Sequence, residues 1–137
     1  MMRVFRLLLV GALVLTAACS VLPTYKDDFT KKNEDFILRI RWLDFAGASL
    51  HFENEIRTEF VERFEDVDDL KVTEFSIARI DIDAPKEKVT VHYRLEYYLL
   101  PSATIKKERF PLTWEKQPGD EQGKAYWRIT DPFPELD

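Results

Sequence analysis

The 137-residue sequence predicts an α+β domain in which two N-terminal helices, or one bent helix, pack on a curved four-stranded antiparallel meander sheet. Three observations support this class. Apolar residues recur at helical spacing between residues 36 and 67. After residue 69 the pattern changes to the two-residue alternation of half-buried strands. Short breaks then separate four alternating stretches, and short connections favour antiparallel neighbours.

The chain opens with a segment typical of export signals. Arg3 and Arg6 precede an apolar run over residues 7–18, which is shorter than the roughly 20 residues that span a bilayer. Its end, Leu15-Thr16-Ala17-Ala18-Cys19, resembles the lipobox of bacterial lipoproteins. The resemblance implies cleavage before Cys19 and attachment of acyl chains, such as palmitate, to its sulfur and new amino group. By resemblance to Gram-negative lipoproteins, in which Asp after the cysteine favours retention in the inner membrane, Ser20 implies an outer-membrane protein that faces the periplasm.

A transmembrane anchor, or a secreted protein with a chance cysteine, is the alternative to this lipoprotein signal. The predicted segments are a signal peptide over 1–18, a lipidated N-terminus and tether over 19–32, and one domain over 33–137. The formal charge of −5 becomes −7 after cleavage, because two arginines are lost and all 25 acidic residues remain. An acidic domain is a poor match for nucleic acid. With a single cysteine, the chain has no intrachain disulfide.

Two helical stripes follow the predicted tether. The first has Thr30 or Asn33 as a candidate N-cap and places these apolar residues on one side: Phe36, Ile37, Ile40 and Leu43. The second stripe consists of Phe52, Ile56, Phe60, Phe64 and Val67. Gly47-Ala48-Ser49 between them fits either a turn between two helices or a tight contact inside one bent helix.

The strands are expected near residues 70–83, 87–100, 103–116 and 124–131. Their register follows from the apolar pattern, because a slip of one residue would turn the apolar set outward. The predicted facing pairs of the central hairpin are Val89 with Trp114, Val91 with Leu112 and Tyr93 with Phe110. The pairs expected on either side are Ile82 with Val89, Ile80 with Val91, Leu112 with Ile129, and Trp114 with Trp127.

This order of elements resembles the NTF2-like and cystatin-like folds, in which a curved sheet wraps a helical layer. The resemblance includes Arg41-Trp42-Leu43-Asp44-Phe45, which is similar to their early helix, and Ala125-Tyr126-Trp127-Arg128-Ile129-Thr130, which is similar to their last strand. Proteins of this type bind ligands, catalyse, dimerise or act as scaffolds, so the fold does not determine the function. Their enzymes often use an Asp–His pair or a buried Asp and Tyr inside the cone.

Residues with catalytic or metal-binding chemistry are sparse. His51 lies near the helix junction, and His92 should point to the outer sheet face. Asp44 is the best inward carboxylate candidate, because its helix carries the apolar core stripe nearby. A solvated or helix-capping role for Asp44 is the alternative. The acidic groups at 66–69 and 81–83 lack a calcium-loop pattern, and no histidine pair has zinc spacing. We therefore predict no catalytic residue, no metal site and no cofactor.

Two surfaces are candidate binding sites. The inner sheet face carries Tyr93, Tyr97, Phe110, Trp114 and Trp127, which fit either core packing or a cone for an apolar ligand. The predicted register gathers Phe75, Ile77, Tyr98, Leu100 and Ile105 on the outer face. Exposed apolar patches mark partner surfaces, although a β-bulge in the first strand would return Phe75 and Ile77 to the core.

These observations predict a membrane-anchored, periplasm-facing lipoprotein that is not an enzyme. It is expected to bind a protein partner, or to self-associate as a homodimer, through the outer sheet face. The alternative is a binding protein for a small apolar or lipid-like ligand in the aromatic-lined cone.

Overall fold

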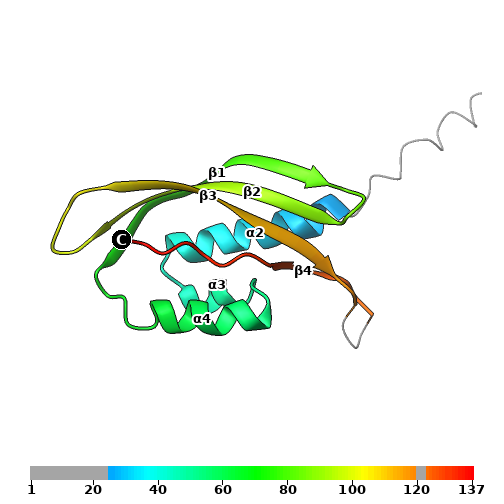
Figure 1. Ribbon diagram of the computed structural model, residues 1–137, viewed down its shortest axis with the longest axis horizontal. Coiled ribbons are helices and arrows are strands. Elements are labelled where there is room, and N and C mark those ends of the chain that lie inside the picture. The colour runs from blue at the N-terminus through cyan, green and yellow to red at the C-terminus, as the bar shows by residue number, and fades with distance from the viewer. Residues whose placement is uncertain (1–24, 120–122) are drawn as a thin grey trace, which may run out of the picture.

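A computed structural model describes residues 25–119 and 123–137, in which three helices precede four strands (Figure 1). The helices are α2 (Tyr25–Arg41), α3 (Phe45–Ser49) and α4 (Asn54–Phe64). The strands are β1 (Leu70–Asp83), β2 (Lys88–Leu99), β3 (Lys106–Gln117) and β4 (Tyr126–Ile129). They form one antiparallel sheet in the order β1-β2-β3-β4, which confirms the predicted α+β meander. The predicted signal peptide and Cys19 lie outside the described residues.

The helices cover one face of the sheet, and a single aromatic core joins the two layers (Figure 1). Phe36 of α2 is completely buried, and its ring lies edge-on to those of Tyr93 and Trp114. Phe133, in the segment after β4, packs against Phe60 of α4 and so closes the core from the C-terminal side. None of the helices in the described part of the chain has the length and apolarity required to cross a membrane.

Helix α2 begins earlier than predicted. Phe29 is buried against Trp114 and Trp127, so the end of the segment predicted as a tether over 19–32 is a helix that belongs to the domain. Asn33 is a buried residue inside α2 and not its N-cap, and it accepts a hydrogen bond from the Tyr93 hydroxyl. The polar Asn33 interrupts the apolar stripe between Phe29 and Phe36, which is why helical periodicity alone placed the start too late.

The segment between the two predicted stripes is a separate short helix. Leu43 follows the end of α2 and has a positive φ of 59°, so the chain leaves the helical path there. Asp44 is then the N-cap of α3. The Asp44 carboxylate accepts a hydrogen bond from the Gly47 N–H at 2.9 Å. The structure thus selects two separate helices with α3 between them, and the capping alternative for Asp44 is confirmed.

The predicted register is correct for the first two hairpins. Val89 faces Trp114 and Ile80 faces Val91, and the other predicted pairs of β1, β2 and β3 are also found. Between β3 and β4 it is wrong by two residues, because Trp114 faces Ile129 and Trp127 faces Lys116. A shift of two preserves the side-chain face, so Trp127 and Ile129 are still buried.

Strand β1 contains two register shifts, between Val72 and Glu74 and between Ile77 and Arg79. Relative to the predicted pairing of Ile80 with Val91, the shift between Ile77 and Arg79 pairs Phe75 with Leu95, a core residue, so Phe75 is buried and its predicted place on the outer face is wrong. The extra residue of a β-bulge reverses which side chains face the core. This confirms the bulge alternative for Phe75.

Candidate functional site

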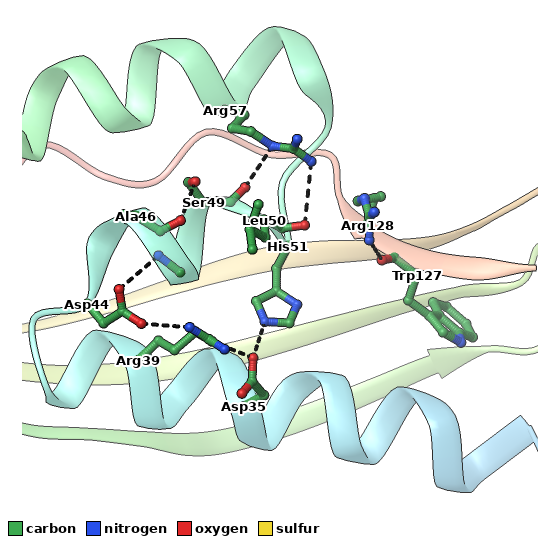
Figure 2. Close-up of polar contacts among 11 residues, drawn as sticks. Asp35, Arg39, Asp44, Ala46, Ser49, Leu50, His51, Arg57, Trp127 and Arg128 are labelled. Carbon is green, nitrogen blue, oxygen red and sulfur yellow. Dashed lines mark hydrogen bonds and ion pairs between the residues drawn. The ribbon is translucent and has the colours of Figure 1, made fainter. Parts of the chain in front are cut away.

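A buried histidine and a carboxylate from a different element form the centre of the candidate site (Figure 2). His51 lies in the loop between α3 and α4, and its Nε2 is 2.7 Å from Oδ2 of Asp35 on α2. Arg39, one helical turn after Asp35, donates from Nε to the same carboxylate oxygen at 2.7 Å. Its Nη1 donates to the Asp44 carboxylate at 2.6 Å, so one guanidinium joins α2 to the start of α3.

Gly47 allows this close approach. A Cβ at position 47 would collide with the Arg39 guanidinium and the Asp44 carboxylate, which meet at this point of α3. Glycine therefore permits the ion pair and the helix cap to coexist. Any larger residue at position 47 would displace Arg39 or Asp44.

Two further arginines approach from the other side of His51. Arg57 on α4 donates from its guanidinium to the carbonyl oxygens of Ser49 and Phe52, each at 3.1 Å. Arg128 on β4 lies over the Tyr126 ring, 4.5 Å from its centroid. Within the described residues, neither Arg57 nor Arg128 forms an ion pair with a carboxylate.

These side chains enclose a surface pocket of about 330 Å³. Its lining residues come from α2, α3, α4, β4 and the loop after α3: Lys32, Asp35, Arg39, Gly47, Leu50, His51, Arg57 and Arg128. Four of these side chains are basic and one is acidic, although the whole chain has a net negative charge. We name this site the basic pocket.

The protonation states follow from burial and from these neighbours. Burial lowers the pKa of His51, and the positive charges of Lys32 and Arg39 lower it further, against the opposing effect of Asp35. Burial opposes ionisation of Asp35, but hydrogen bonds from Arg39 and His51 outweigh it and hold the pKa of that carboxyl below its usual value. At neutral pH a neutral imidazole thus donates from Nε2 to an ionised carboxylate, which leaves Nδ1 as an acceptor.

The lowered pKa of His51 predicts a pH-dependent contribution to stability. The unfolded chain binds the His51 proton near its usual pKa of about 6.5, whereas the folded chain binds it only at lower pH. At pH values between the folded-state pKa and the unfolded-state pKa of His51, the unfolded chain binds more protons than the folded chain does. The free energy of unfolding therefore decreases as the pH falls through this range. We expect His51→Gln to reduce the loss of stability that urea unfolding measures between pH 7.5 and pH 5. An unchanged slope in His51→Gln would contradict the assignment.

The five aromatic residues predicted to line a cone are all buried core residues. The Trp114 indole donates to the Tyr93 hydroxyl at 3.0 Å, and Tyr93 in turn donates to Asn33, so the buried polar groups satisfy one another. Four surface pockets of the described residues have none of the five side chains in their lining. Core packing therefore accounts for Tyr93, Tyr97, Phe110, Trp114 and Trp127.

The predicted outer-face residues separate into three groups. Phe75 is in the core, and Ile77 pairs with Tyr93 on the helix-facing side of the sheet, where it remains exposed. Leu100 and Ile105 are exposed at the end of the β2–β3 hairpin. Tyr98 is partly buried and alternates with the inward-facing Tyr97, as predicted. The predicted patch is consequently smaller than expected.

Sequence reasoning did not find the basic pocket. Only the spacing of Asp35 and Arg39, four residues apart on one helix, could be recognised as an interacting pair. Arg57 and Arg128 belong to elements far apart in the sequence, and nothing in their local pattern distinguishes them from surface arginines. Among the described residues there is no group of three side chains arranged to bind a metal ion.

Comparison with known proteins provides information on the fold. No protein-family model and no curated protein matches this chain. The fold is similar to that of a SEC-C motif containing protein from Psychrobacter arcticus, with a TM-score of 0.50, 9% identity, and coverage of 74% of this chain and 55% of that chain. A SEC-C motif containing protein from Rhodopseudomonas palustris has a TM-score of 0.49 and 10% identity over 71% of this chain and 72% of that one. The likeness to the first protein shows the α+β fold alone and spans about half of that protein's length.

Proposed function

We propose that this chain is a lipid-anchored envelope protein whose domain binds a small anion, bearing carboxylate or phosphate groups, in the basic pocket. The observation that supports this function is the presence of Arg57 and Arg128 beside His51 without a carboxylate partner among the described residues. The acidic lining residue, Asp35, already accepts hydrogen bonds from Arg39 and His51. The pocket therefore has uncompensated positive charge.

The electrostatics favour an anionic occupant. Burial lowers the pKa of Arg128 from its usual value, and the neighbouring charge of Arg57 lowers it further. This destabilisation of the charged form would be relieved by an anion between the two guanidinium groups. A planar guanidinium matches carboxylate and phosphate oxygens in a two-pronged geometry. His51 Nδ1 adds an acceptor for a hydroxyl or a protonated oxygen of the same ligand.

A binding role agrees with the chemistry of the lining residues better than covalent catalysis does. The side chains that line the basic pocket include no hydroxyl and no thiol. Asp35 is held ionised by its two hydrogen-bond donors, so its carboxylate serves to orient His51. We accordingly assign no catalytic residue.

Replacement of Arg128 by Gln tests the function by calorimetric titration of the full chain with inorganic phosphate and with citrate. Loss of one charge-assisted hydrogen bond costs roughly 1.5–3 kcal/mol, so affinity should fall about tenfold or more. Arg109→Gln, an exposed arginine on β3, is the matched control and should bind like the wild type. Preference for phosphate or citrate identifies the ligand class. A wild-type chain that binds neither probe at millimolar concentration would disprove the proposal, as would equal binding by Arg128→Gln.

The lipid anchor in this proposal rests on the lipobox resemblance at Cys19, and the outer-membrane location rests on Ser20. Helix α2 begins at Tyr25, six residues after Cys19. Six residues reach at most about 20 Å when fully extended, so a lipidated Cys19 would keep the basic pocket close to the bilayer. Two or more acyl chains give stable membrane attachment.

The finer fold assignment, NTF2-like or cystatin-like, is part of the same proposal. It is supported by the helical layer that covers one face of an antiparallel meander. Partner binding through Tyr98, Leu100 and Ile105 on the outer face stays a prediction.

A further inference from the structure

The two edges of the sheet differ in how they are covered. At the β4 edge, the Ile129 N–H donates to the His51 carbonyl at 2.8 Å, and the Glu53 N–H donates to the Ile129 carbonyl at 3.0 Å. The loop before α4 thus occupies that edge. At the opposite edge, β1 pairs with β2 on one side, and no other described backbone segment bonds to it. An uncovered edge strand presents free N–H and C=O groups to any strand that approaches.

Apolar side chains accompany the open β1 edge. Ile80 and Ile82 face Val91 and Val89, which are buried on the helix-covered side of the sheet. The two isoleucines are nevertheless 40% and 53% exposed, and Ile77 is 41% exposed. The helices therefore leave the end of β1 uncovered. A row of exposed isoleucines beside an unpaired edge favours strand addition.

We propose that a second copy of this chain pairs antiparallel with β1 about a two-fold axis at Ile80, so that the two sheets become continuous. The charges on β1 complement those of a second β1 that runs antiparallel to it, which favours a second copy as the partner and favours this register. Arg79 and Asp81 flank Ile80 on the outer face, where they form an ion pair with each other at 2.9 Å while their side chains remain 65% and 51% exposed. With the axis at Ile80, Arg79 of each copy lies opposite Asp81 of the other, and the two Ile80 side chains meet.

Neighbouring registers are disfavoured by the same charges. With the axis at Arg79 or at Asp81, two like charges would lie directly opposite each other, which destabilises a strand pair. A shift by one residue would place apolar side chains of one copy against the charged face of the other. β1 is regular from Arg79 to Asp83, and the register shift between Ile77 and Arg79 lies just before this stretch. The proposed contact is therefore centred on the three regular residues Arg79, Ile80 and Asp81.

Charge-reversal variants test the pairing by native mass spectrometry of the full chain, released from detergent micelles without added phosphate or citrate. The wild type should form a dimer. Arg79→Asp should lose it, because Asp would face Asp81 of the second copy, and Asp81→Arg should lose it through two facing arginines. A mixture of the two single variants should form a heterodimer, since every facing pair is then complementary. The double variant, with both charges exchanged, should form the homodimer again.

The control is Arg109→Asp, a charge reversal of an exposed residue on β3 that should leave the dimer intact. Misfolding of a single variant is excluded when that variant forms the heterodimer. A wild-type chain that stays monomeric at all concentrations up to about 0.1 mM, above the micromolar dissociation constants of moderately strong complexes, overturns the proposal. Dimers that persist in either single variant, or single variants that fail to combine, also overturn it. Anion binding in the basic pocket is independent of each of these outcomes.

Discussion

Replacement of Phe36 by Ala is expected to lower the free energy of unfolding by about 3–5 kcal/mol, the usual cost of removing a buried phenyl ring. Phe36 is completely buried on α2. Its ring centroid lies 5.7–5.9 Å from five other aromatic rings of the loop and the sheet, and all five contacts are edge-on: His51, Phe52, Phe75, Tyr93 and Trp114. A cavity at this point would separate the helical layer from the sheet.

Urea unfolding followed by tryptophan fluorescence measures this effect. Leu38→Ala on the same helix is the matched control, because Leu38 is 50% exposed and its truncation should cost no more than about 0.5 kcal/mol. Comparable losses in Phe36→Ala and Leu38→Ala would mean that α2 is not held to the sheet through Phe36.

Replacement of Cys19 by Ser is expected to move the chain completely from the membrane fraction to the soluble fraction. The sulfur is the atom to which the resemblance assigns acylation, and serine offers no thiol for it. Without acyl chains, the acidic domain has little affinity for a bilayer surface with anionic headgroups. Immunoblotting of separated membranes measures the distribution.

Ser20→Ala is the control for this experiment, because it alters the neighbouring residue and retains the cysteine. It should stay membrane-bound. If Cys19→Ser also remained in the membrane fraction, the lipoprotein prediction would be wrong, and the apolar run before Cys19 would have to serve as the anchor.

Much of the sheet could be predicted from local patterns. Alternation of apolar and polar residues identified β1, β2 and β3, and the pairing of Val89 with Trp114 followed because any odd shift would expose the apolar face. The same rule cannot distinguish shifts of two residues. The pairing of β3 with β4 was therefore wrong in position while the face of Trp127 was right.

Local patterns failed where one residue depends on distant contacts. The bulge near Ala78 turns Phe75 into the core, and its position is determined by how β1 packs on β2 and the helices. Asn33 is tolerated inside α2 because the Tyr93 hydroxyl, from another element, satisfies its side chain. Neither partner is visible in the sequence around these residues.

By itself, the sequence determined the α+β class and the apolar faces of β2, β3 and β4, because these depend on composition and on spacing along a short segment. Only the tertiary structure decided where His51 meets Asp35, where Arg57 and Arg128 lie without a carboxylate partner in the described part of the chain, and which sheet edge remains open. Those features come from elements far apart in the chain. Their distances are set by packing in three dimensions, which no local periodicity encodes.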